Sequence, residues 1–218
     1  IGSVGYADGH FAVELDGQTL EADKLLVAAG RRANLSDLGL ETVGLDPTAR
    51  SLATDGRMRV QDGLWAIGDI TGRGAFTHIS MYQSAVAARD ILGEQGPEAA
   101  YHAVPRVTFT DPEIGAVGMT ESQARDAGLS VRVALTEVAS SARGWIHGTG
   151  NDGFIKLVED ADRGVLVGAT SAGPLGGEVL SALAVAVHAE VPTSALTGMI
   201  YAYPTFHRGI EDALGKLA

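Results

Sequence analysis

The residues with the richest potential for chemistry lie in MIYAYPTFHRGIEDAL, residues 199–214. This stretch combines two tyrosines, a proline, a histidine, an arginine and two carboxylates. His207 and Glu211 are four residues apart and would share one face of a helix, so Glu211 could orient His207 as an acid–base group. The alternative is a terminal helix in which Glu211 forms an ion pair and His207 lies at a subunit surface. The spacing alone permits both interpretations.

A second set of candidates follows a short strand that the sequence predicts at residues 64–67. Gly68 and Asp69 end this strand, and a glycine-rich turn leads into helical periodicity over residues 76–92. A carboxylate at the carboxyl end of a strand, followed by a helix, is typical of a ligand-binding edge in an α/β sheet. The alternative role for Asp69 is to cap the turn. Five apolar residues are expected to share the buried face of the helix: Phe76, Ile79, Ala85, Ala88 and Leu92.

The elements before these candidates are a predicted hairpin and a predicted buried strand. Asp16-Gly17 separates two segments of alternating hydrophobicity, which is a strong hairpin signal. Residues 24–30 form a continuous apolar run that ends at Gly30 and indicates a strand buried on both faces. The residues before it offer too few neighbours for such a strand, so we expect the chain to begin inside a domain. The polar, turn-rich residues 31–60 then connect two units.

The second half of the chain alternates predicted strands with predicted helices. The expected elements are strands at 104–110, 114–119 and 130–138 and a helix at 121–127. Thr120 and Gln123 have the spacing of a capping box at the start of that helix, and Gly128 is placed to end it. A further hairpin is expected to turn through residues 161–164.

The most apolar helix is expected after Pro174, in the segment LGGEVLSALAVAVHAEV, and stops before Pro192. Nearly every side of this helix carries apolar or small residues, so it must be covered on every side. A sheet of its own chain would cover one flank, and we expect a partner subunit to cover the other. The alternative is a core helix of a monomer.

Composition excludes several classes of function. The chain has 218 residues, of which 45% are hydrophobic and 20% are charged, as in an ordinary globular protein. A formal net charge of −11 argues against nucleic-acid binding, and no apolar run is long enough to span a membrane. The absence of cysteine excludes a redox-active Cys pair within these residues, and no metal site is predicted. No signal peptide is visible, so the expected location is the cytoplasm.

Four stretches of the chain occur in an order that is similar to one known family. They are VAAGRRANLSDLGLETVGL, TDGRMRVQDGLWAIGDIT, VPRVTFTDPEIGAVGMTESQA and GFIKLVEDADRGVLVGATSAG. They resemble the end of the nicotinamide-binding domain, the second flavin-binding motif, the opening of the dimerisation domain and the hairpin after it in pyridine nucleotide–disulphide oxidoreductases. The flavin-binding motif falls on Thr54, Trp65, Ala66, Gly68 and Asp69. In the first stretch, Ala33 stands where the family usually has proline.

This resemblance implies a fold and a division into domains. The fold would be an α+β dimerisation domain, an antiparallel sheet with helices, preceded by C-terminal pieces of α/β dinucleotide-binding domains. Residues 1–50 would end the nicotinamide-binding domain, residues 51–103 would end the FAD-binding domain, and residues 104–218 would form the dimerisation domain. The family's glycine-rich G-x-G-x-x-G loops and C-x-x-x-x-C motif are absent. We therefore expect a C-terminal part of a longer flavoenzyme that is inactive alone.

The resemblance also implies cofactor contacts, with FAD and with NAD or NADP, in the longer protein. Asp69 would accept a hydrogen bond from a ribitol hydroxyl of FAD, because a charged acceptor suits a partly desolvated site. Backbone N–H groups at residues 76–78 would face the flavin pyrimidine edge, where the helix dipole favours negative charge. The residues assigned to cofactor binding are Gly30, Gly68, Asp69, Phe76, Thr77 and His78.

The implied function is an FAD-dependent NAD(P)H oxidoreductase that works as a homodimer and passes hydride to a small-molecule acceptor. In disulphide-reducing members, a His before a Pro and a Glu five residues later form an acid–base dyad in the partner's active site. Here Tyr203 and Arg208 stand at those positions, and a phenol is a poor base at neutral pH. The candidate catalytic residues are Tyr203, His207 and Glu211, with a quinone, a second nicotinamide or a disulphide as acceptor. The alternative is a non-enzymatic, self-associating module without flavin.

Overall fold

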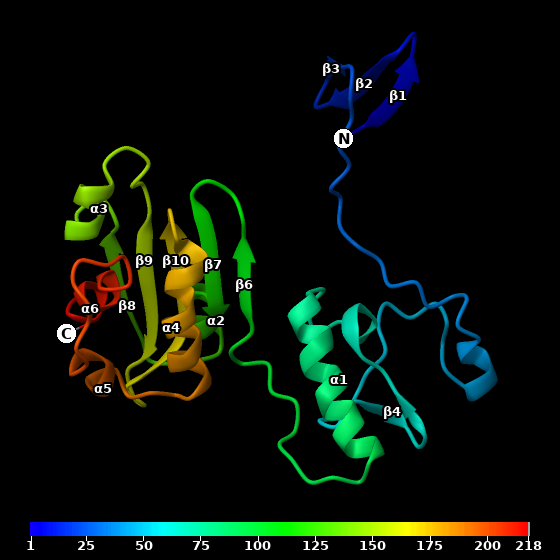
Figure 1. Cartoon of the computed structure of the whole chain (residues 1–218). Coiled ribbons are helices and arrows are strands. Elements are labelled where there is room, and N and C mark those ends of the chain that lie inside the picture. Colours follow the sequence, from blue (N-terminus) through cyan, green and yellow to red (C-terminus); the bar gives the residue numbers. More distant parts are fainter. Residues whose placement is uncertain (218) are drawn as a thin grey trace. The chain divides into compact units, whose positions relative to one another are not determined.

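The structure is a computed structural model that describes residues 1–217, and the chain divides into two compact units, Ile1–Leu52 and the residues from Ala53 onward. The first unit contains a three-stranded antiparallel sheet in the order β1-β2-β3 (Figure 1). Its elements are β1 (Ser3–Ala7), β2 (His10–Leu15), β3 (Gln18–Ala22) and the 3₁₀ helix η1 (Leu40–Val43).

The predicted hairpin around Asp16-Gly17 is confirmed. It joins β2 to β3, with Leu15 paired to Gln18. Asp16 and Gly17 have φ angles of 49° and 81°, the pair of positive values that a two-residue hairpin turn requires. This turn forms from local chemistry alone, because Asp and Gly both tolerate positive φ.

The strand predicted at residues 24–30 is wrong for this chain. These residues are extended but unpaired, and Leu26 and Val27 are 91% and 72% exposed. A strand buried on both faces needs a neighbour along each edge, whereas β1, β2 and β3 pair only with one another among the described residues. The apolar run therefore has no sheet to join here.

The second unit begins with a small hairpin and one long helix. Its first elements are β4 (Arg59–Gln61), β5 (Leu64–Trp65), the 3₁₀ helix η2 (Gly68–Thr71) and α1 (Thr77–Ile91). The strand predicted at residues 64–67 is shorter than expected, because the backbone leaves the ladder after Trp65 and turns into η2. The helix predicted from residue 76 is confirmed.

The buried face of α1 is rotated about the helix axis relative to the predicted face, so the prediction is wrong. The buried residues are Ile79, Gln83, Val86 and Ala87. Ala85, Ala88 and Leu92 are exposed, and Phe76 is only partly covered. The face is centred on a glutamine because its polar groups find hydrogen-bond partners inside the protein, which removes the cost of burying them.

A five-stranded antiparallel sheet forms the rest of the second unit, in the order β6-β7-β10-β9-β8. The strands are β6 (Pro105–Thr108), β7 (Glu113–Gly118), β8 (Val131–Glu137), β9 (Phe154–Asp160) and β10 (Val165–Gly173). The helices are α2 (Glu121–Asp126), α3 (Ala142–His147), α4 (Gly176–His188), α5 (Thr193–Thr197) and α6 (Gly209–Leu214). The predicted strands, the β9–β10 hairpin and the α2 capping box of Thr120 and Gln123 are confirmed, whereas α3 was not predicted.

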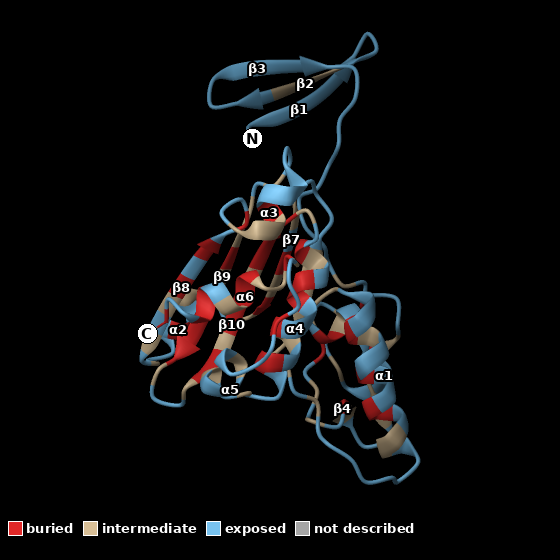
Figure 2. Ribbon diagram, turned by 60° about the vertical axis from the view of Figure 1, so that its left-hand side comes forward, coloured by how far each residue is buried: buried red, intermediate tan, exposed pale blue. Residues whose placement is uncertain are grey.

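The core lies between this sheet and the helices α4 and α6. α4 packs on β6, β7 and β10, and α6 packs on β8 and β9. Buried residues line the sheet face and one side of α4 (Figure 2). Leu157 and Leu183 are at most 1% exposed in this cluster. Among the described residues, no helix is long and apolar enough to cross a membrane.

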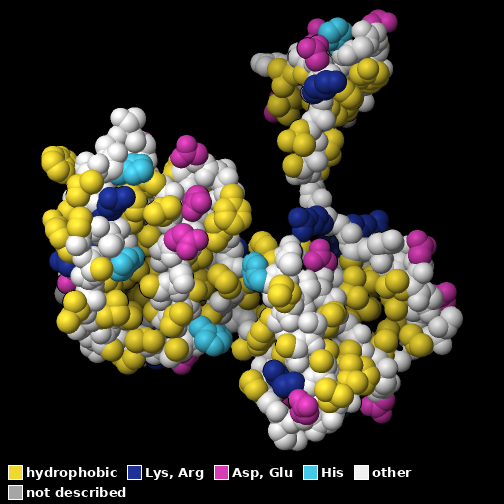
Figure 3. All heavy atoms as spheres, in the orientation of Figure 1, with side chains coloured by type: hydrophobic (Ala, Val, Ile, Leu, Met, Phe, Trp, Pro, Cys, Tyr) yellow, Lys and Arg dark blue, Asp and Glu magenta, His cyan; other side chains and the backbone are white. Residues whose placement is uncertain are grey.

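α4 is covered on one side only within a single copy of the chain. Val179, Leu183 and Val187 face the core, whereas Val185 on the opposite side is 63% exposed. Nearby in the sequence, Leu175 and Ile200 are 46% and 96% exposed. The surface on which α4 lies mixes apolar side chains with acidic and histidine side chains (Figure 3). The helix predicted to need cover all round therefore leaves one flank open, on which Ala182 and Val185 are exposed together with the polar residues Glu178 and Ser181.

Candidate functional site

The turn that carries Asp69 is the short 3₁₀ helix η2, and hydrogen bonds hold its first residue, Gly68, in place. Gly68 has φ 78°, which an L side chain rarely adopts, and its buried N–H donates to Gln83 Oε1 at 2.6 Å. Thr71 Oγ1 donates back to the Gly68 carbonyl at 2.8 Å. The Asp69 carbonyl accepts from the Gly72 N–H at 3.2 Å, and the Asp69 side chain is exposed. A rigid backbone thus presents a carboxylate at the surface.

Gln83 is the residue that holds this turn, and it was not predicted from the sequence. Its side chain is 0% exposed. Besides accepting from Gly68, its Nε2 donates to Thr71 Oγ1 at 3.0 Å and to the Tyr101 hydroxyl at 2.9 Å. Tyr101 in turn donates to Met58 Sδ at 3.4 Å. The signal in the sequence was a lone glutamine between Ile79 and Val86 on the buried stripe of α1.

The N-terminus of α1 lies soon after the turn and has no side-chain cap. Its N-cap residue, Phe76, is extended and accepts from the N–H groups of Ile79 and Ser80 at 3.0 and 3.2 Å. The first N–H groups of any α-helix lack intrahelical acceptors, and the helix dipole makes this end positive. The backbone at Thr77 and His78 can therefore offer donors to an anionic or carbonyl group.

The His78 side chain is turned to its own chain. His78 Nε2 lies 2.9 Å from the Pro105 carbonyl, so this nitrogen carries the proton and donates. The His78 ring also stacks on Phe76, with ring centroids 5.1 Å apart. The group of His78 that is available to a ligand is therefore its backbone N–H.

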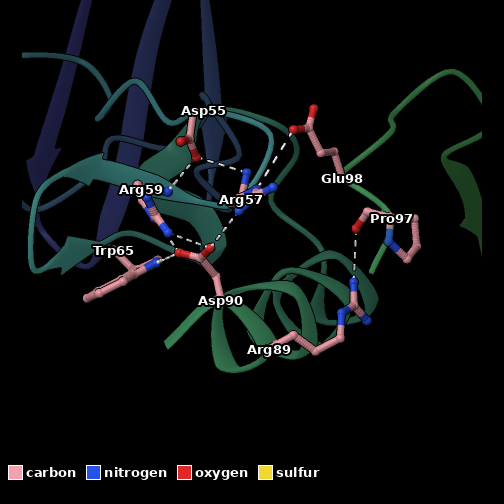
Figure 4. Close-up of polar contacts among 8 residues, drawn as sticks. All are labelled: Asp55, Arg57, Arg59, Trp65, Arg89, Asp90, Pro97 and Glu98. Carbon is pink, nitrogen blue, oxygen red and sulfur yellow. Dashed lines mark hydrogen bonds and ion pairs between the residues drawn. The ribbon is translucent and has the colours of Figure 1, made fainter. Parts of the chain in front are cut away.

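An ion-pair cluster fastens the β4–β5 hairpin to the end of α1 (Figure 4). Asp90 is 5% exposed and accepts two hydrogen bonds from Arg59, one from Arg59 Nε and one from Nη2 at 2.7 Å. Trp65 Nε1 donates to the same carboxylate at 2.9 Å, and Arg57 lies 3.6 Å from it. On the hairpin side, Asp55 accepts from the backbone N–H groups of Arg57 and Arg59. The cluster fixes the hairpin that leads into the Asp69 turn.

Acid should loosen this cluster. Hydrogen bonding from Arg59 lowers the pKa of Asp90, so the folded chain holds this carboxylate ionised below the pH at which the unfolded chain protonates it. The stability from Asp90 is therefore present above about pH 4 and is lost as the pH falls through the folded-state value. We expect Asp90→Asn to melt at a lower temperature than the unaltered chain at neutral pH, and the difference to shrink under acid. Thermal unfolding at several pH values measures this, and a difference independent of pH would contradict it.

The segment around Tyr203 contains His207 and Glu211, for which the sequence left two interpretations open. His207 precedes α6, and Glu211 Oε2 lies 2.9 Å from Arg208 Nη1, in an ion pair too poorly aligned for a hydrogen bond. Arg208 also lies over the ring of Tyr203, 5.5 Å from its centroid, and Tyr203 is 69% exposed. Burial, aided by Glu211, raises the pKa of Tyr201. Of the two interpretations from the sequence, the geometry matches Glu211 in an ion pair.

Two further observations concern ligand binding elsewhere in the chain. Gly30, assigned to cofactor binding, lies in the first unit with φ 108° and is exposed. Within residues 1–217, no three His, Asp or Glu side chains gather as metal ligands.

Comparison with known proteins matches the chain along most of its length. Residues 104–214 match the family model of the pyridine nucleotide-disulphide oxidoreductase dimerisation domain, and residues 5–105 match the pyridine nucleotide-disulphide oxidoreductase model. The dihydrolipoyl dehydrogenase of Bacillus subtilis is 34% identical over 197 residues, which are 89% of this chain and 42% of that protein. That of Geobacillus stearothermophilus is 38% identical over 86% of this chain and 40% of its own length. The chain thus spans about two fifths of the curated relatives it matches.

Solved structures show the same relationship. LpdA from Mycobacterium tuberculosis superposes with a TM-score of 0.89 at 28% identity, covering 100% of this chain and 48% of that one. The HOCl-induced flavoprotein disulfide reductase RclA from Escherichia coli superposes with a TM-score of 0.84 at 27% identity, covering 97% and 49%. The expected fold, an antiparallel dimerisation sheet with helices after a mixed α/β part, is confirmed. The chain belongs to the pyridine nucleotide-disulphide oxidoreductase family.

Proposed function

We propose that this chain is the C-terminal portion of an FAD-dependent NAD(P)H oxidoreductase, in which it supplies a flavin contact and the homodimer interface. The observation that carries the proposal is the exposed Asp69 on a backbone-locked turn, followed by the uncapped N-terminus of α1. Flavin, when bound, would take hydride from a nicotinamide and pass electrons to an acceptor.

The donors and acceptors at the site fit the polar parts of a flavin. Asp69 is an acceptor that suits a ribitol hydroxyl, and a charge-assisted bond of this kind is worth roughly 1.5–3 kcal/mol. The N–H groups at Thr77 and His78 suit a flavin carbonyl, and the positive helix end favours negative charge on the ring. Gly68 accepts the positive φ that brings the next residue to the surface. These residues would orient the cofactor rather than supply most of its binding energy.

The homodimer is proposed from the open flank of α4. Val185 is exposed on a helix whose other side is packed into the core, and residues 104–214 match a dimerisation-domain model. A second copy of the chain is the natural cover for such an open flank. Obligate interfaces of this type bury on the order of 2,000 Å² or more.

Tyr203 is proposed to shape the partner's flavin pocket. It is exposed, and Arg208 stacked over its ring limits its motion. The relatives are named dihydrolipoyl dehydrogenases, but the His and Glu that the family resemblance places here are Tyr203 and Arg208 in this chain. We therefore propose that the acceptor is a small molecule reduced without that dyad.

The complete protein tests the proposal directly. It should purify with the visible absorption band of oxidised flavin, lose the band when NADH or NADPH is added without oxygen, and regain it with an acceptor. A quinone, a second nicotinamide and a low-molecular-weight disulphide, offered separately, identify the acceptor class. A protein that stays colourless even after refolding with FAD would favour the non-enzymatic, self-associating alternative.

Single alanine variants separate structural from acid–base roles at the C-terminal segment. We expect Tyr203→Ala to raise KM for the acceptor, because it removes a wall of the pocket, and His207→Ala to leave kcat within about twofold, since Glu211 pairs with Arg208 instead. Steady-state turnover across pH measures both. A loss of kcat in His207→Ala, with the alkaline or acid limb of the pH profile removed, would restore His207 as an acid–base group.

A further inference from the structure

We propose that Gln83 is a positioning residue that holds the Gly68–Asp69 turn in its flavin-binding shape and ties it to Tyr101 in the connection to β6. The inference rests on the proposed flavin contact of Asp69. Gln83 lies on α1 and touches no cofactor group itself, so it would act through the backbone of Gly68. Nothing in the residue spacing around Asp69 identifies it.

The chemistry of the amide explains why a glutamine stands here. The turn presents a backbone donor at Gly68 and a hydroxyl at Thr71, and the connection presents a second hydroxyl at Tyr101. One glutamine side chain accepts from the first at 2.6 Å and donates to the other two at 3.0 and 2.9 Å. The whole side chain is 0% exposed, so water cannot replace any of these bonds. Without Gln83, the buried Gly68 N–H would have no acceptor, and the turn would have to open to reach water.

The bonds continue beyond the turn into the connection between α1 and β6. Tyr101 accepts from Gln83 and donates to Met58 Sδ, and Met58 is 0% exposed. In the next residue, His102, the ring nitrogen Nε2 is 3.2 Å from the carbonyl oxygen of His188, which lies in the last turn of α4. Two adjacent residues of the connection, Tyr101 and His102, therefore contact Gln83 on α1 and the last turn of α4, respectively. A change at Gln83 should be felt at Tyr101, and the reverse.

Amide hydrogen exchange and flavin release together test the proposal. The Gln83→Leu variant keeps a side chain of similar volume that makes no hydrogen bond. In this chain, its Gly68 amide should exchange at least about tenfold faster. In the complete protein, the same variant should bind FAD about 10- to 100-fold more weakly. Gln83→Glu keeps an acceptor for Gly68, and its buried carboxyl group can donate to Thr71 or Tyr101 in the protonated form that burial favours, so it should recover part of the affinity. Val86→Ala, on the same buried face, should lower the melting temperature without changing either readout.

A double-mutant cycle checks the link to the connection. Tyr101→Phe removes only one hydroxyl and should also weaken FAD binding, and its effect should be smaller in the Gln83→Leu background than alone. This variant also carries the test if Gln83→Leu fails to fold. Additive effects at the two positions would overturn the link.

The outcomes separate this inference from the proposed function. If Asp69→Ala weakens FAD binding and Gln83→Leu does not, the positioning role is wrong and the flavin contact stands. If neither variant weakens binding, the flavin contact itself is wrong. If Gln83→Leu and Val86→Ala weaken binding in proportion to their losses of melting temperature, Gln83 is a structural residue only.

Discussion

Replacing Val185 with glutamate is expected to turn the proposed dimer into a folded monomer. Val185 is 63% exposed on the flank of α4 that a partner would cover, so each protomer would bury one unpaired carboxylate in the interface. An uncompensated buried charge costs about 3–5 kcal/mol, which weakens the dimer by a factor of about 100 or more. The helix itself should survive, because glutamate has a higher helix propensity than valine and this position faces away from the core.

Sedimentation or light scattering at several protein concentrations measures the change. Ser122→Glu is the matched control, since it adds the same charge on the exposed first turn of α2, where the helix dipole tolerates an acid. That variant should remain dimeric. A Val185→Glu protein that stays dimeric with an unaltered circular dichroism spectrum would show that another surface holds the two copies together.

The Asp69→Ala variant of the complete protein is expected to bind FAD about 10- to 100-fold more weakly. The substitution removes one charge-assisted acceptor, worth roughly 1.5–3 kcal/mol. The Asp69 side chain is exposed, and the turn is held by backbone groups of Gly68 and by Thr71 and Gln83. The fold should therefore survive the change while the cofactor contact is lost.

Two comparison variants sharpen this result. Asp69→Asn keeps a neutral acceptor of the same shape and should recover part of the affinity. Asp62→Ala removes an equal charge from the exposed turn between β4 and β5 and should leave FAD binding unchanged. The flavin released by dilution, followed by fluorescence, gives the dissociation constants. Equal affinity in Asp69→Ala and Asp62→Ala would exclude a direct role for Asp69.

If both results hold, cofactor binding and assembly would rest on different parts of one short chain. The Asp69 turn would hold the ribitol end of the flavin, and α4 would join two copies. Tyr101, which Gln83 contacts, and His102, which contacts the carbonyl of His188 on α4, are adjacent residues of the connection between α1 and β6. The Gln83–Tyr101 cycle would then measure how strongly the flavin turn depends on that connection.

Features that depend on neighbours in the chain could be predicted from the sequence alone. The Asp16-Gly17 turn and the Thr120–Gln123 capping box formed as expected, because each is satisfied by groups within a few residues. The β9–β10 hairpin follows the same logic. The family could also be identified, since four motifs occur in the right order over nearly the whole chain.

Only the tertiary structure decided which distant groups meet. The buried face of α1 is rotated from the predicted one because Gln83 bonds with Gly68, Thr71 and Tyr101, 12 to 18 residues away. Over a short range, Glu211 is paired with Arg208, the N-cap residue of α6, whereas His207 lies before the helix although its spacing matched a helix face. The sequence pattern shows how hydrophobic or polar each position is, but it does not show which groups will contact that position after folding. Whether a buried polar group is satisfied depends on partners that folding brings together, and at Asp69 those partners shape the site.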